Sequence, residues 1–338
     1  MSTLSDLRRA AANVVLTGLS EETLRDGFAC RVASYPFGGF IFFDRNAKTR
    51  ESLRALTDRL RACYPQLPPI LAIDQEGGSV MRLREGVEAL PPASDLGATE
   101  DEGLCERIGT RCAFDLRRAG CNLNFAPVLD LAVEPRNTVV GSRAFGSDPR
   151  IVARLAGAFA RGLENGGVVA TFKHFPGHGS TIVDSHVALP VVELDEVTLR
   201  ARDLLPFTIL APRARAMMTA HVVVPALDAQ LPATLSPRVH SILREEFGFK
   251  GVCFTDCLQM AAIADVVGSI EGAIAALRAG ADMAIVSHNL DLAVEVVERI
   301  ECAVEGGELS WDRLSQASGR VDALRSQLAP PLESTDSR

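Results

Sequence analysis

The sequence predicts an α/β protein whose fold is a single (β/α)₈ barrel, and three observations support this. Short apolar runs alternate with amphipathic segments along the whole chain. The runs are nearly continuous, as expected of parallel strands that are buried on both faces. Eight runs are each followed by a helical segment, which is the count for a closed barrel. A length of 338 residues is within the range that such barrels reach as one domain.

The strands are expected where apolar residues run without interruption for four or five positions. These segments are 13–17, 39–43, 70–73, 122–126, 168–172, 216–220, 251–255 and 283–287. The alternative of a doubly wound open sheet is less favoured, because no Gly-rich fingerprint follows the first strand. No linker rich in Gly, Ser or Pro divides the chain, so one domain is expected.

The helices are expected where apolar residues recur with helical spacing and a capping residue precedes them. The first begins at a Ser-Glu-Glu capping signal, and the second is laced with Arg and Asp. These segments are 20–35, 47–63, 100–119, 148–165, 195–210, 236–247, 269–279 and 289–305. A last helix over 311–328 ends before two prolines. The domain is therefore expected to cover 1–328, and a disordered tail 329–338.

Composition excludes several classes of function. The formal net charge is −8, which argues against nucleic acid or an anionic membrane as a partner. No apolar run is long enough to cross a bilayer. The start, MSTLSDLRRAAANVV, is typical of an amphipathic helix rather than a signal peptide. The eight cysteines form no CxxC pair, which favours buried reduced thiols and a cytoplasmic protein. No metal site and no cofactor are expected.

Polar residues gather at the carboxyl ends of the expected strands. In a barrel these ends meet at one rim, where the chemistry of such folds is found. Six of the eight strands contribute to this rim. The residues are Asp74, Asp130, Lys173 with His174, His221, Asp256, and Ser287 with His288. Any one of these polar residues could lie there simply because a loop begins at the strand end. That explanation is less favoured for all of them together.

The motifs at this rim resemble glycoside hydrolase family 3. They are IDQEGGSVMR at 73–82, KHFPGHGSTIVDSH at 173–186, MMTAH at 217–221, PATLSP at 232–237 and GFKGVCFTDCLQM at 248–260. They occur in the family's order, and the resemblance covers roughly residues 10–325. More narrowly, they look like the single-domain bacterial β-N-acetylglucosaminidases of cell-wall recycling.

The resemblance implies a barrel enzyme that removes terminal β-linked N-acetylglucosamine by a retaining double displacement. It implies that Asp256 is the nucleophile and that His186 is the general acid/base, paired with Asp184. It further implies that five residues hold the sugar, namely Asp74, Arg82, Arg143, Lys173 and His174. Ser142, Ser180 and Cys257 depart from the usual residues of the family, but none removes a catalytic position.

The residues support parts of this chemistry by themselves. Asp256 ends the apolar run GVCFT and could be a rigidly placed nucleophile or a helix N-cap. Asp184 and His186 are one residue apart, which places both on one face of an extended chain. A carboxylate beside an imidazole fixes its tautomer, although such a pair alone is more often a surface loop.

The sugar-binding candidates have alternatives as well. Lys173 and His174 could be a solvated strand end. Arg82 and Arg143 could form surface ion pairs, and the partner of Arg143 would then be Asp148. His178 could be a simple loop residue, and His221 could line the floor of the site. The chain has one Trp and two Tyr, so a compact pocket for one terminal sugar fits better than a long cleft.

Three other functions stay open. One is a metal-dependent hydrolase that uses His174, His178, Asp184 and His186. Another is a sugar-binding barrel without catalysis. The third is transfer of the sugar to phosphate, because a neutral histidine repels phosphate less than a carboxylate does. The resemblance implies a small saccharide or muropeptide as the partner, with 1,6-anhydro-N-acetylmuramic acid as the leaving group. The chain is expected to be a monomer or a weak homo-oligomer.

Overall fold

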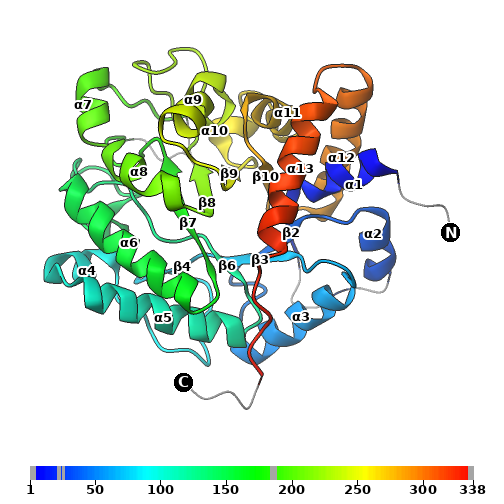
Figure 1. The fold of residues 1–338 in the computed structure, drawn as a ribbon, viewed down its shortest axis with the longest axis horizontal. Coiled ribbons are helices and arrows are strands. Elements are labelled where there is room, and N and C mark those ends of the chain that lie inside the picture. The colour runs from blue at the N-terminus through cyan, green and yellow to red at the C-terminus, as the bar shows by residue number, and fades with distance from the viewer. Residues whose placement is uncertain (1–4, 21–23, 25–26, 183–188, 334–338) are drawn as a thin grey trace.

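The computed structural model describes residues 5–20, 24, 27–182 and 189–333. Eight parallel strands close into a barrel in the order β1-β10-β9-β8-β7-β6-β3-β2. The strands are β1 Val15–Gly18, β2 Gly39–Phe42, β3 Ile70–Ile73, β6 Leu123–Asn124, β7 Val169–Phe175, β8 Ala216–Thr219, β9 Val252–Cys257 and β10 Met283–Val286. They lie at the centre of the molecule, with helices outside them (Figure 1). The predicted (β/α)₈ barrel is confirmed.

Two strands differ from their expected bounds in a way that matters for the site. β7 continues to Phe175, so Lys173 and His174 lie inside a buried strand rather than after it. β6 is only two residues long, because Pro127 has no N–H to offer to a continued ladder. The chain after β6 still follows β7, with Val128 paired to Lys173.

The helices surround the barrel as expected, with three exceptions. Among the described residues of the expected helix 20–35, only α2 Phe28–Ser34 is helical, because Gly27, its N-cap, has a left-handed backbone with φ 82°. The expected helix 195–210 divides at Arg202–Leu204, and α8 begins with Pro206 in its first turn. The segment 236–247 is a short helix followed by a π-helical turn, η4 Ile242–Glu246. The helices are α1 Asp6–Asn13, α2 Phe28–Ser34, α3 Arg50–Ala62, α4 Ala93–Thr99, α5 Glu102–Arg118, α6 Pro149–Asn165, α7 Glu196–Ala201, α8 Leu205–Leu210, α9 Pro237–Ser241, α10 Ala261–Ala264, α11 Ser269–Ala279, α12 Leu290–Glu305 and α13 Trp311–Arg325.

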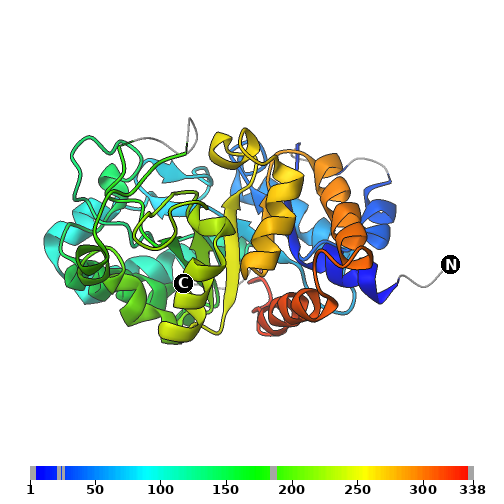
Figure 2. The same cartoon turned by 90° about the horizontal axis from the view of Figure 1, so that it is seen from above.

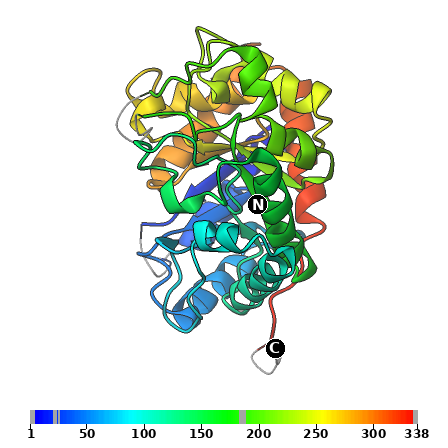
Figure 3. The ribbon, with the colours of Figure 1, turned by 90° about the vertical axis from the view of Figure 1, so that its left-hand side faces the viewer.

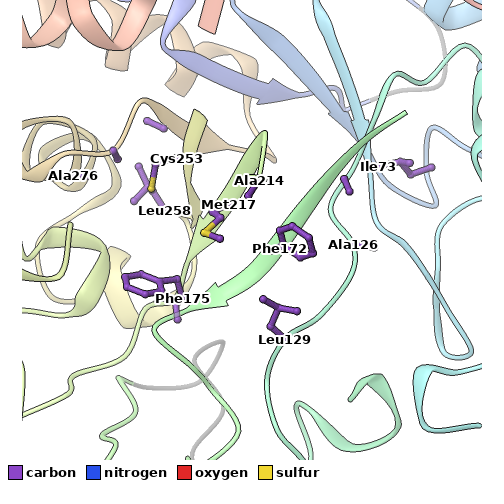
Figure 4. Close-up of a cluster of buried hydrophobic side chains, with 14 of the residues drawn as sticks. Ile73, Ala126, Leu129, Phe172, Phe175, Ala214, Met217, Cys253, Leu258 and Ala276 are labelled. Atoms are coloured by element: carbon purple, nitrogen blue, oxygen red, sulfur yellow. The ribbon is translucent and has the colours of Figure 1, made fainter. Parts of the chain in front are cut away.

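Two apolar clusters fix this arrangement. One fills the barrel interior with inward-facing strand residues such as Leu16, Phe125 and Phe254, and α13 closes its lower end with Val321 and Leu324. Figure 2 shows α13 in red below the strands. The other cluster lies between the strands and the outer helices, and part of it is drawn in Figure 4. Because apolar residues fill the amino-terminal end of the barrel, the opposite end is the one left to polar side chains.

The chain beyond α13 contacts the outside of the barrel. Arg117 donates to the carbonyl oxygen of Pro330, and Arg54 donates to that of Leu332. This part of the expected tail, residues 329–333, therefore passes α5 and α3 (Figure 3), and residues 334–338 are outside the described part. All eight cysteines are free thiols, and four of them are buried. Among the described helices, none has the length and apolar character to span a bilayer.

Candidate active site

A pocket of about 500 Å³ opens at the carboxyl ends of the strands. Its lining extends along the chain from Ile41 to His288, and the closed barrel brings these distant residues to one rim. The polar lining comprises Asp74, Glu76, Arg82, Arg143, Lys173, His174, His178, Asp256, Cys257, Gln259, Ser287 and His288. A second pocket of about 570 Å³ lies at the other end, among residues of α1 and α13, and contains none of the strand-end residues. Chemistry rather than size therefore selects the first pocket.

Asp256 is held by β9, whose preceding residues Val252–Thr255 are buried. Its Oδ1 accepts a hydrogen bond from the backbone N–H of Cys257 at 2.7 Å. It caps no helix, because α10 begins at Ala261 with Met260 as its N-cap. Burial acts to raise the pKa of Asp256, but the charges of His221 and His174 outweigh it and hold the pKa below its usual value. Asp256 is thus a carboxylate at neutral pH, as a nucleophile must be.

Four charged side chains form a network on the facing wall. The Nζ of Lys173 lies 2.8 Å from Oδ1 of Asp74 and 2.7 Å from Oε1 of Glu76. The guanidinium of Arg143 binds both oxygens of Glu76, at 2.7 and 2.8 Å. The alternative partner for Arg143 is excluded, because Asp148 instead caps α6. The pKa of Lys173 is raised, because attraction to Asp74 and Glu76 exceeds the lowering by burial.

The hairpin after β3 places the acidic half of this network. Its strands are β4 Gln75–Gly77 and β5 Val80–Met81. Gln75 is buried, with its side chain bound to both backbone groups of Leu83 and its own N–H bound to Asn124. Asp74 and Glu76 flank Gln75, and in extended backbone such neighbours point to the same face. Both carboxylates therefore meet Lys173.

A second buried pair sits beside the network. Nδ1 of His174 lies 2.5 Å from Oδ2 of Asp130, and the backbone N–H of His178 donates to Oδ1 of Asp130 at 2.6 Å. Burial acts to raise the pKa of Asp130, but His174 and His178 outweigh it and lower the pKa. Because Nδ1 of His174 is bound to Asp130, its Nε2 is the ring nitrogen left for the pocket.

Arg82 lines the pocket next to Phe43. Its guanidinium carbon lies 5.7 Å from the centroid of the Phe43 ring, and its Nη1 lies 3.8 Å from Asp44. Its Nε is buried and has no hydrogen-bond partner among the described residues. The distance to Asp44 is too long for a hydrogen bond. The half-buried guanidinium of Arg82 is therefore placed to bind a ligand in the pocket.

Asp184 and His186, the expected acid/base pair, lie outside the described residues. The loop before them is anchored at the pocket. Asn137 donates to the carbonyl oxygen of His178 at 2.8 Å, and Oγ1 of Thr181 lies 2.8 Å from the ring of His178. On the far side, Val191 pairs with Val223 next to β8. Among the described residues no group of His, Cys, Asp or Glu has the arrangement of a metal site.

The structure adds Glu76, which the sequence did not single out. Glu76 stands in the IDQEGG motif, and its spacing of two from Asp74 is the signal that could have found it. Cys257 lies beside Asp256, with its Sγ 2.8 Å from Oγ of Ser287, which in turn lies 2.8 Å from Nδ1 of His288. His221 does not line the pocket. It is buried, and its Nε2 donates to the carbonyl oxygen of Cys257 at 3.0 Å.

Known proteins match most of this chain. Residues 15–324 match the profile of the glycosyl hydrolase family 3 N terminal domain. The chain is 45% identical over 270 residues to a beta-hexosaminidase of Pseudomonas aeruginosa, covering 78% of this chain and 80% of that one. It is 41% identical over 292 residues to a beta-hexosaminidase of Stenotrophomonas maltophilia, covering 83% and 84%.

Solved structures agree. A glycoside hydrolase family 3 beta-N-acetylglucosaminidase from Paenibacillus sp. str. FPU-7 has a TM-score of 0.93 and 38% identity, over 98% of this chain and 66% of that one. The chain thus spans about two thirds of that protein. NagZ from Neisseria gonorrhoeae, solved in complex with N-trifluoroacetyl-D-glucosamine, has a TM-score of 0.77 and 33% identity, over 92% and 98%.

Proposed function

Because this chain belongs to glycoside hydrolase family 3, we propose that it is a retaining exo-β-N-acetylglucosaminidase. The observation that carries the proposal is Asp256. It is an ionised carboxylate fixed near the end of β9, and it lines the same pocket as the charged side chains that can bind sugar hydroxyls. Relatives named beta-hexosaminidase and beta-N-acetylglucosaminidase support the choice of sugar. The pocket measures about 500 Å³ among the described residues, which suits one terminal sugar better than a long polysaccharide and favours removal of a terminal residue.

The reaction would take two steps. Asp256 attacks the anomeric carbon while the glycosidic C–O bond breaks, and His186 gives its proton to the leaving oxygen. Water then attacks the same carbon, His186 takes the proton of the water, and the bond to Asp256 breaks. Two inversions at one carbon give net retention. Asp184 would orient His186 and stabilise its charged form.

The charged wall would bind the sugar. Asp74 accepts from sugar hydroxyls, and the donors are Lys173, Arg143, Arg82 and His174. Glu76, the remaining member of the network with Lys173, Asp74 and Arg143, binds cations through both of its oxygens. Terminal N-acetylglucosamine on 1,6-anhydro-N-acetylmuramic acid, with or without peptide, is the proposed natural substrate. The eight free thiols suit a reducing compartment, and we therefore propose the cytoplasm.

Hydrolysis of an aryl β-N-acetylglucosaminide followed by proton NMR tests this function. The β-anomer of N-acetylglucosamine must appear first, since retention is built into the two-step route. First appearance of the α-anomer would contradict the proposal. Adding phosphate to the same reaction detects a glycosyl phosphate and so identifies a phosphorylase, and loss of activity in chelator would instead favour the metal-dependent alternative.

A further inference from the structure

Glu76 occupies a position between two cations that the proposed reaction does not yet explain. Its side chain is 5% exposed, and its Oε1 accepts from both Lys173 and Arg143, at 2.7 and 2.8 Å. Its Oε2 accepts from Nε of Arg143 at 2.7 Å. No other described residue binds both cations. Within the described part of the chain, Glu76 is therefore the side chain that joins Lys173 of β7 to Arg143 of the turn η1 Gly141–Arg143.

The two cations need this link. Their side chains are 3% and 17% exposed, so water screens their repulsion poorly. Lys173 also binds Asp74, whose side chain is 15% exposed and lies on the pocket side. The four side chains together carry no net charge. Removing Glu76 would leave Arg143 without its carboxylate and Lys173 with one anion in place of two.

We propose that Glu76 is a positioning residue, which holds the Lys173 ammonium and the Arg143 guanidinium at the spacing that, with Asp74, binds the terminal sugar. It acts through these two donors, since both of its oxygens are already occupied. This inference rests on the proposed function and adds to it the origin of the sugar-binding geometry.

Titration of Lys173 provides a readout that a merely structural role would not move. The charged groups that face its ammonium are Asp74, Glu76, Arg143 and, across the pocket, Asp256. Burial and Arg143 act to lower its pKa, whereas Asp74 and Glu76 raise it by more. Removing the charge of Glu76 therefore brings the pKa of Lys173 down. The alkaline limb of N-acetylglucosamine binding, which unlike kcat/KM does not require the proton that His186 gives, must then move to lower pH.

The first test compares wild type with Glu76→Gln, using an aryl β-N-acetylglucosaminide for turnover and calorimetry for binding of N-acetylglucosamine. We expect KM and the dissociation constant to rise about tenfold or more, because charge-assisted bonds to both donors are weakened. We expect kcat to change less than KM, and the alkaline limb to move down. A folded Glu76→Gln protein with wild-type KM and wild-type sugar affinity would overturn the inference.

A matched control is available on the surface. Glu271 makes the same two-point contact with Arg299, at 2.8 and 3.0 Å, and its side chain is 50% exposed. Glu271→Gln makes the same chemical change at a residue that does not line the pocket. It must leave KM, sugar affinity and the alkaline limb as in wild type, and a parallel change in this variant would also contradict the inference.

Glu76→Asp keeps the inference testable if Glu76→Gln does not fold. It retains the charge, so the alkaline limb must stay near that of wild type. Its carboxylate is one methylene further from the cations, so KM must still rise. Wild-type KM in Glu76→Asp would overturn the inference. Wild-type protein that neither turns over nor binds N-acetylglucosamine would refute the proposed function itself, which is a separate outcome.

Discussion

Specific partners keep the buried carboxylates in and beside the pocket ionised. Asp130 has a side-chain exposure of 0% and depends on His174 and on the backbone N–H of His178. Burial alone would raise its pKa, and these contacts reverse the direction of the shift. The same balance holds for Asp256 and Glu76, whose pKa values are also lowered despite burial. The site thus keeps three negative charges in a largely apolar barrel by pairing each with donors.

Asp130→Asn tests the role of the Asp130–His174 pair. An amide can donate to Nδ1 of His174 and reverse its tautomer, so we expect kcat/KM to fall about tenfold or more. The folded-state pKa of Asp130 is lowered, so its stabilising contribution is full above about pH 4 and is lost as pH falls through the lowered pKa. The wild-type advantage in Tm over the variant must therefore shrink between pH 7 and pH 3. An advantage that stayed constant over this range would contradict the assignment.

The loop after β7 depends on a close approach between elements. Gly179 packs against Leu131, and a Cβ at residue 179 would collide with the carbonyl oxygen of Leu131. We expect Gly179→Ala to displace the loop that leads to Asp184 and His186, and to lower kcat about tenfold or more. Steady-state kinetics on purified variant measures this.

Gly319→Ala is the matched control for that loop. Gly319 is exposed in α13, and a methyl group there meets nothing within 4 Å. Alanine in a helix is favoured over glycine by about 0.5–1 kcal/mol. We expect a small gain in stability and unchanged kcat. Equal kinetics in both variants would show that the packing of Gly179 does not matter for catalysis.

The elements themselves are predictable from the sequence to different degrees. All eight strands are confirmed, because continuous apolar runs such as 70–73 are typical of strands buried on both faces. The break between α7 and α8 is not predicted, since helical spacing continues across it. Arg143 could not be matched to Glu76 from sequence, because 67 residues separate them and Asp148 is a nearer acid. The closed barrel brings such distant residues together, and the local spacing of residues in the sequence does not predict these pairs.

Across the whole molecule, stability and catalysis lie at opposite ends of the barrel. At the lower end, Asp282 is fully buried and accepts from Arg244, Arg313, Arg320 and the backbone N–H of Cys253. These contacts join α13 and η4 to the start of β10. Apolar residues of α13 close the same end. No residue of this cluster lines the active-site pocket.

Asp282→Asn measures this separation. Removing the charge leaves three arginines without their shared anion, and a broken buried pair costs about 3–5 kcal/mol. We expect the free energy of unfolding, from denaturant titration, to fall by about that amount, with KM of the folded protein unchanged. An unchanged denaturation midpoint would contradict the separation of stability and catalysis between the two ends of the barrel. A raised KM under conditions where the variant is fully folded would contradict it as well.

The central claim is that Asp256 forms a covalent bond to the sugar, and trapping tests it most directly. Wild type, Asp256→Ala and the exposed control Asp95→Ala are treated with the 5-fluoro glycosyl fluoride of N-acetylglucosamine, and intact masses are recorded. One sugar adduct must form on wild type and on Asp95→Ala but not on Asp256→Ala, whose kcat must fall about 10³-fold or more. Turnover without an adduct, unaffected by Asp256→Ala, would contradict the claim.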